Sequence, residues 1–262
     1  MARSGEGKAT RAGDGEMGET AASIDPGEAA KFARMAGTWW DPAGPMRPLH
    51  RLNPARLAFV RDRVCGRFGR DPLASRPLDG LAVLDVGCGG GLIAEPLARL
   101  GARVTGIDAA AENIEVARRH AETGGLAIDY QAAAAEDLAA AGMRYDVVLA
   151  LEVVEHVADV SSFVGAVATL VRPGGVAVLA TLNRTVKSFA LAIVGAEYVL
   201  NWLPRGTHDW NRFLRPSELA GHLRRHGLGA AELKGLAYAP FTDAWYESDD
   251  LDVNYMVLAV KP

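Results

Sequence analysis

Short apolar runs alternate with helical spacing through the middle of the chain. Five runs rich in leucine or β-branched residues predict strands over residues 81–86, 103–107, 127–130, 145–151 and 176–181. Helical spacing predicts helices near residues 92–99, 112–122 and 160–170. Because the predicted strands are apolar on both faces, the alternation predicts an α/β fold in which helices cover both sides of a parallel sheet. Ligands in this architecture bind beyond the carboxyl ends of the strands.

Capping signals predict two helices ahead of the first strand. Asp25 can cap a helix whose first residue is Pro26, and Glu28 at the third helical position completes a capping box. A second helix is expected to begin at the pair Asn53-Pro54 and to end near Phe68.

Composition narrows the functional classes. The 262 residues carry a formal net charge of −4, so no global basic field favours a nucleic-acid partner. Only Cys65 and Cys88 are present, too few for a disulfide framework or a four-cysteine zinc site, as expected in a reducing cytosol. No apolar stretch reaches the roughly 18 residues of a membrane-spanning helix. Residues 1–24 are expected to form a disordered tail ahead of one domain over residues 25–262.

A glycine-rich loop follows the first predicted strand. Gly87 and Gly89 would let backbone amides approach a ligand at the start of a helix. The dinucleotide-binding pattern requires a third glycine where this chain has Leu92, so the sequence disfavours a nicotinamide-dependent reductase. The loop is not a P-loop either, because no Gly-Lys-Ser/Thr follows it. Asp85 would repel a pyrophosphate but suits a ligand that carries an ammonium and a sulfonium.

An acidic residue ends the second predicted strand. Asp108 stands 21 positions after Gly87, where a carboxylate can accept hydrogen bonds from both hydroxyls of a ribose. The same residue could instead cap the following helix. The glycine loop and Asp108 together resemble the S-adenosylmethionine-dependent methyltransferase pattern.

A polar cluster follows the fourth predicted strand. If this stretch is helical, Glu152, Glu155 and His156 share one face where substrate would meet cofactor. His156 could then be a general base that deprotonates a phenol, or the three side chains could hold a divalent ion that binds the phenolate. A third interpretation gives Glu155 and His156 only capping and core hydrogen bonds and leaves Glu152 facing the cleft.

Motifs from residue 28 to residue 260 resemble the ubiquinone-biosynthesis O-methyltransferase family. The motifs that carry this resemblance, beside Phe32 and the glycine loop, are WWD at 39–41, PLHRLNPAR at 48–56, EVVEH at 152–156, TLNR at 181–184, VGAEY at 194–198, GTHD at 206–209 and DVNYM at 252–256. The resemblance implies a Rossmann-like class I methyltransferase fold with a mostly parallel seven-stranded sheet. It also implies methylation of the phenolic oxygen of polyprenylated catechol and demethylubiquinol intermediates.

The same resemblance implies the residues of the site. S-adenosyl-L-methionine would contact Arg56, Gly87, Gly89, Asp108 and the backbone of Leu151. His156 and Glu155 would be catalytic, and Glu152, Glu155 and His156 would hold Mg²⁺ if the metal is used. Another small-molecule methyltransferase of this fold, or a non-catalytic lipid-associated subunit, remain alternatives. The histidines His120, His222 and His226 are expected to be solvated.

A nearly all-apolar helical stretch is expected after the fifth strand. It forms part of a helical insertion predicted over residues 184–215, above the active site. Arg184, Lys187 and Arg205 flank it, so residues 187–203 are expected either to be buried or to contact membrane lipid. The expected partners are the polyprenyl substrate, membrane lipid and other ubiquinone-biosynthesis enzymes, with the protein cytoplasmic and peripheral to the inner membrane.

Overall fold

The computed structural model describes residues 23–191 and 209–262. Most of the predicted tail and residues 192–208 of the predicted insertion lie outside these ranges. Within the described ranges, no helix is both long and apolar enough to cross a membrane.

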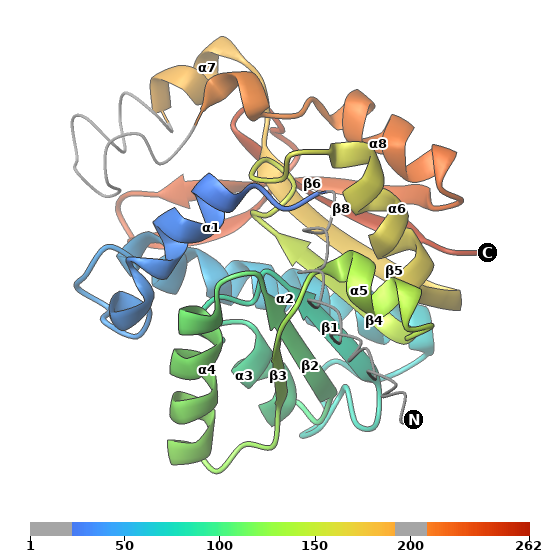
Figure 1. Cartoon of the computed structure of the whole chain (residues 1–262). Coiled ribbons are helices and arrows are strands. Elements are labelled where there is room, and N and C mark those ends of the chain that lie inside the picture. The colour runs from blue at the N-terminus through green and yellow to red at the C-terminus, as the bar shows by residue number, and fades with distance from the viewer. Residues whose placement is uncertain (1–22, 192–208) are drawn as a thin grey trace, which may run out of the picture.

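An eight-stranded sheet organises the chain (Figure 1), in the order β3-β2-β1-β4-β5-β8-β6-β7. The five parallel strands are β1 (Ala82–Val86), β2 (Arg103–Asp108), β3 (Asp129–Ala132), β4 (Tyr145–Leu151) and β5 (Val171–Leu182). The three antiparallel strands are β6 (Gly229–Ala239), β7 (Ala244–Ser248) and β8 (Asn254–Val260). The mostly parallel α/β fold is therefore confirmed.

The expected number of seven strands is wrong by one, because β6 has two successive partners. Its first half pairs with β8 from Gly229 to Lys234, and its second half pairs with β7 from Gly235 to Ala239. The second half extends past the end of β8, and β7 supplies the ladder hydrogen bonds that this extension would otherwise lack.

Helices cover both faces of the sheet (Figure 1). The helices α2 (Arg47–Phe68), α3 (Ala94–Arg99) and α4 (Ala111–Thr123) contribute to one core cluster. On the other face, α5 (Ala135–Ala140), α6 (Val160–Leu170) and α8 (Pro216–Arg225) contribute to a second cluster. Along β5, Val176 and Val178 enter the first cluster while Ala177 and Leu179 enter the second. This alternation explains why the strand is apolar at every position from Val176 to Ala180.

The N-terminal helices differ in part from the prediction. The helix α1 (Pro26–Ala33) is capped by Asp25, whose Oδ1 accepts from the amides of Gly27 at 2.9 Å and Glu28 at 3.3 Å. Glu28 does not complete a capping box, because its carboxylate binds a side chain elsewhere. The short 3₁₀ helix η1 (Ala36–Thr38) follows.

The predicted start of α2 at Asn53 is wrong, since the helix begins at Arg47. Pro48 supplies the favourable proline at the first turn, and Pro54 lies inside the helix. Asn53, Arg56 and Phe59 are buried on one side of α2, and this packing outweighs the hydrogen bond that Pro54 cannot donate. After β5, the single turn α7 (Val186–Ser188) and the 3₁₀ helix η3 (Trp210–Arg212) flank the undescribed residues.

Candidate active site

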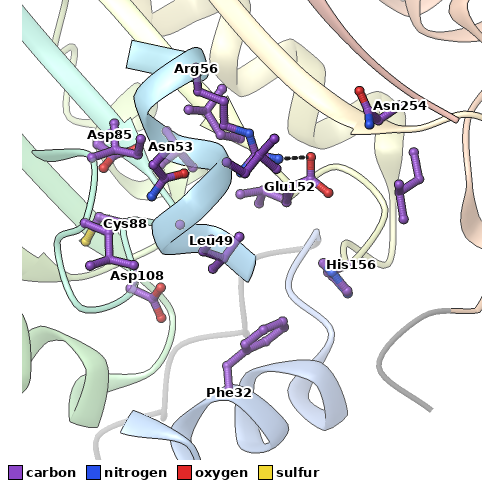
Figure 2. A pocket seen from close by; sticks show the side chains of 18 of the residues that line it. Phe32, Leu49, Asn53, Arg56, Asp85, Cys88, Asp108, Glu152, His156 and Asn254 are labelled. Atoms are coloured by element: carbon purple, nitrogen blue, oxygen red, sulfur yellow. Dashed lines mark hydrogen bonds and ion pairs between the residues drawn. The ribbon is translucent and has the colours of Figure 1, made fainter. Parts of the chain in front are cut away.

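A cavity of about 740 Å³ lies at the carboxyl ends of β1, β2 and β4. One part is lined by Asp85, Gly87 and Asp108, and another part by Leu236 and Trp245. Figure 2 shows polar side chains from α2, β1, β2 and the segment after β4 around this space. The cavity is therefore where doubly wound α/β folds bind ligands.

The glycine loop closes one wall of the cavity. Gly87 has a φ of 69° and Gly89 a φ of 51°, a region that side-chain-bearing residues rarely adopt. A Cβ on Gly89 would lie 2.4 Å from the ring of Trp39, and a Cβ on Gly87 would lie 2.5 Å from Val153 Cγ2. Both glycines are thus required by the backbone and by close neighbours, whatever ligand the loop holds.

Asp108 faces the loop and the following helix at once. Its Oδ2 accepts from the amide of Gly89 at 3.0 Å, while its Oδ1 accepts from the Ala110 amide at 2.8 Å and from Asn113 Nδ2 at 3.1 Å. Burial raises the pKa of Asp108, and these three hydrogen bonds oppose the shift. Since a carboxylate offers about four acceptor positions, Asp108 can also receive a ligand hydroxyl.

Five buried polar atoms in the cavity wall have no hydrogen-bond partner within the described residues. They are Asp85 Oδ2, Asn53 Oδ1, Arg56 Nε and both carboxylate oxygens of Glu136. Burial raises the pKa of Asp85 to about 7, with repulsion from Asp108 adding to the shift. Because buried polar groups are nearly always paired in native proteins, these atoms indicate a ligand that carries both a cationic and an anionic group.

Arg56 lies one turn after Asn53 on α2, and only 4% of it is exposed. Its Nη2 donates to Glu152 Oε1 at 2.5 Å, as Figure 2 shows. A guanidinium has five N–H donors, so this ion pair leaves other donors for a ligand carboxylate.

The three predicted metal ligands do not share a face. The chain after β4 forms a turn, because Glu152 has a φ of 57° and the next helix, α6, begins only at Val160. Helical spacing therefore does not apply to Glu152, Glu155 and His156. No three histidine, cysteine, aspartate or glutamate side chains within residues 23–191 and 209–262 are grouped to hold a metal ion. The residues present do not fit the magnesium site that the resemblance implied.

Each member of this trio has a different partner. Glu152 pairs with Arg56, and the buried Glu155 accepts from Thr181 Oγ1 at 2.9 Å through its Oε2. Burial, followed by repulsion from Glu152, raises the pKa of Glu155 well above its usual range. Glu155 is absent from the cavity lining, whereas Glu152 and His156 belong to it. Glu155 therefore lies behind the cavity lining, and its catalytic role stays a prediction.

His156 interacts with the first helix. Its Nδ1 lies 2.8 Å from Glu28 Oε2, and its ring meets Phe32 edge-on with centroids 5.2 Å apart. Burial lowers the pKa of His156, but the hydrogen bond to Glu28 and the charge of Glu155 outweigh burial, so the pKa is raised. His156 therefore lies beside the cavity, as its interpretation as a general base requires.

Two tryptophans cover the glycine loop. Trp39 lies against Gly89 and Gly90 and donates from Nε1 to Asn113 Oδ1 at 2.8 Å. Trp40 donates to the Gly90 carbonyl at 2.9 Å and stacks on His120 with ring centroids 3.5 Å apart. His120 also contacts buried Glu95, so the expectation that this histidine is simply solvated is wrong.

Sequence comparison places these features among known proteins. The ubiquinone biosynthesis O-methyltransferase of Methylobacterium sp. (strain 4-46) is 57% identical over 243 residues, which cover 93% of this chain and 98% of that relative. The protein of the same name from Brucella anthropi is 55% identical over 247 residues, covering 94% of this chain and all of that relative. The chain belongs to this O-methyltransferase family.

Two further comparisons agree with a methyltransferase fold. A family model described as a methyltransferase domain matches residues 84–179. The crystal structure of magnesium protoporphyrin IX methyltransferase from Synechocystis PCC 6803 with bound SAH has a TM-score of 0.62 and 21% identity, covering 90% of this chain and 96% of that one. This likeness supports the fold of the O-methyltransferase.

The cofactor residues expected in an O-methyltransferase of this family fall around one space. Arg56, Gly87, Asp108 and Leu151 line the cavity. Gly89 stands outside the lining and supports the cavity wall instead, by donating to Asp108.

Several site residues of this O-methyltransferase were missed from the sequence. The spacing of three between Asn53 and Arg56 places both residues on one face of a helix, but the pair Asn53-Pro54 also fits a helix start, which was the prediction. Glu136 carried no signal, because the short helix α5 was not predicted. Both carboxylate oxygens of Glu136 are buried without a partner in the described part of the chain, and the residue lines the cavity.

Proposed function

We propose that the chain transfers the methyl group of S-adenosyl-L-methionine to the phenolic oxygen of polyprenylated catechol and demethylubiquinol intermediates. The observation that carries this proposal is one cavity that joins the unpartnered groups near Asp85 and Arg56 to His156 and to an apolar region. Family membership at 55–57% identity supports the same activity.

The residues present fit the cofactor. The α-carboxylate suits Arg56, and the α-ammonium suits Asp85 and Asn53, whose buried oxygens lack partners in the described chain. Asp108 at the end of β2 suits the ribose hydroxyls. When bound, the cofactor supplies a methyl carbon activated by its sulfonium.

The adenine suits a carboxylate on the β3 side of the cavity. Ala132 at the end of β3 pairs in register with Asp108, and Glu136 follows four residues later. The buried oxygens of Glu136 can accept from an exocyclic amine.

His156 is the general base of the proposed reaction. A phenol titrates near ~10, so at neutral pH an acceptor oxygen has to lose its proton as it attacks the methyl carbon. His156 lines the cavity and is the histidine of the cluster after β4. General bases contribute roughly 10²–10⁴-fold to such reactions.

An apolar wall suits the polyprenyl tail. Leu52, Leu191, Leu236, Pro240 and Trp245 line the cavity together with His156. Val186, one residue before the region predicted to contact lipid, is 82% exposed, and Leu191 within that region is 55% exposed. These exposed side chains support membrane-lipid contact by residues 187–203. Such contact would make the protein peripheral to the cytoplasmic side of the inner membrane, with other ubiquinone-biosynthesis enzymes as neighbours.

The activity is tested with purified full-length protein, S-adenosyl-L-methionine and a short-chain demethylubiquinol. We expect a methylated product, identified by mass and by the position of the new methoxy group. Turnover is expected to persist in a chelator, because Glu152, Glu155 and His156 do not form a ligand set. Absence of a methylated quinol at saturating donor would refute the function, and full turnover by His156→Ala would refute the base.

Lipid contact is tested separately by flotation with vesicles that contain anionic phospholipid. We expect the full chain to float and a chain without residues 187–203 to remain at the bottom. Equal flotation of both chains would contradict the proposed lipid contact.

A further inference from the structure

A carboxylate from the first helix meets the proposed base. Glu28 lies on α1 and His156 follows β4, so 128 positions separate the two residues whose Oε2 and Nδ1 atoms lie 2.8 Å apart. Both side chains line the cavity, and Phe32 from the same helix holds the edge of the imidazole ring. Figure 2 shows Phe32 and His156 facing the same part of the cavity.

The contact determines which ring nitrogen can act as a base. An ionised carboxylate only accepts hydrogen bonds, so in the neutral ring it selects the tautomer whose proton is on Nδ1. The lone pair then resides on Nε2, the nitrogen that can receive the phenol proton. We propose that Glu28 is a positioning residue that fixes the tautomer and the orientation of His156 for methyl transfer. This role rests on the proposed function, in which His156 is the base.

Contacts that do not involve Glu28 hold α1 in place. Arg212 Nη2 binds Asp25 Oδ2 at 2.8 Å at the start of the helix, and the Ala158 amide donates to the Ser23 carbonyl at 2.7 Å. These two contacts hold the start of α1 without using Glu28. A variant at Glu28 can therefore alter His156 while the helix stays docked.

Charged groups around the pair come from each neighbouring element. Lys31 on α1 lies 3.6 Å from Glu28, Glu155 precedes His156, and Arg212 of η3 adds positive charge near Glu28. The two cations only donate, so neither would replace Glu28 as an acceptor for Nδ1. Glu155 acts on the ring through its charge, while its Oε2 accepts from Thr181.

The first test records the ring nitrogens of His156 by NMR in ¹⁵N-histidine-labelled full-length protein without ligand. The His156→Ala spectrum assigns the signals. At a pH above the pKa of His156, where the ring is neutral, wild-type protein and the control Arg212→Gln are expected to show the Nδ1–H tautomer, and Glu28→Ala is expected to lose it. The same tautomer in Glu28→Ala as in the wild type would overturn the role of Glu28, whatever the activity.

The second test compares kcat and KM on the short-chain quinol. Glu28→Ala is expected to lower kcat by about 10- to 100-fold, part of the contribution of a general base, with the KM for S-adenosyl-L-methionine changed less than about threefold. Glu28→Gln keeps an oxygen acceptor for Nδ1–H, so we expect it to recover part of kcat. Equal losses in Arg212→Gln and Glu28→Ala would overturn the positioning role, because undocking of α1 would then explain both.

The two proposals fail differently. Full turnover by His156→Ala would overturn the assignment of His156 as the general base, and with it the positioning role of Glu28. An altered tautomer combined with unchanged kcat in Glu28→Ala would overturn only the positioning role.

Discussion

Replacing Asp85 by asparagine should stabilise the ligand-free protein more at pH 8 than at pH 5. Asp85 is buried, and burial raises its pKa from 3.8 to about 7. The folded state therefore binds this proton more tightly than the unfolded state, so the carboxyl destabilises the fold as pH rises from about 4 to 7. Asparagine cannot ionise, so this pH-dependent cost is absent from the variant.

The magnitude follows from linkage between the two pKa values of Asp85. A single carboxyl with these values costs about 2 kcal/mol at pH 5 and about 4 kcal/mol at pH 8. The stability difference between Asp85→Asn and the wild type should therefore shift by about 2–3 kcal/mol in favour of the variant between these pH values. Any fixed cost of packing the amide cancels in this double difference.

Urea unfolding of both proteins at pH 5 and pH 8 measures the shift, with S-adenosyl-L-methionine absent. Titration calorimetry at pH 8 should show weaker donor binding by the variant, because the carboxylate that suits the ammonium is gone. A stability difference that stays constant between pH 5 and pH 8 would refute the reasoning, since it would mean that Asp85 ionises freely in the folded state.

Three further variants probe the cavity wall, each by titration calorimetry with S-adenosyl-L-methionine. Gly89→Ala should weaken binding at least tenfold, because its Cβ would lie 2.4 Å from Trp39, whereas Gly125→Ala, also at positive φ but in open space, should bind as the wild type does. Asp108→Ala should weaken binding by about tenfold or more through lost ribose contacts, and unchanged affinity would remove that assignment. Glu136→Ala should weaken the binding of adenosine-containing ligands about 5- to 20-fold and leave the binding of methionine unchanged. Equal losses of affinity for both ligands would contradict an adenine contact.

The parallel half of the sheet was predictable because most of its strands are buried on both faces. All five predicted strands are present, and in β1, β2, β4 and β5 residues on opposite faces of the strand enter opposite core clusters. β5 begins five residues before the predicted position, because Pro173 and two glycines interrupt the apolar pattern where Val171 still pairs with Tyr145. The eighth strand was hidden because β6 changes partner halfway along its length.

Two predictions at the site failed because they were based on residue spacing within one short segment. Glu28 fits a capping box from sequence, but its carboxylate binds His156. Glu152 and Glu155 fit a helical face, but the positive φ of Glu152 ends that spacing. The first failure comes from a contact between elements far apart in the chain and the second from a backbone conformation that spacing along the segment does not reveal.

Three residues of the site precede the part of the chain that matches the general methyltransferase model. Residues 84–179 contain the glycine loop, Asp108 and His156, while Glu28, Trp39 and Arg56 precede that range. These N-terminal residues each bind a partner inside the range: Glu28 binds His156, Trp39 binds Asn113, and Arg56 binds Glu152. The N-terminal helices therefore complete the site as well as cover it, so a chain that begins at residue 70 should lose methyl transfer even where the sheet still folds.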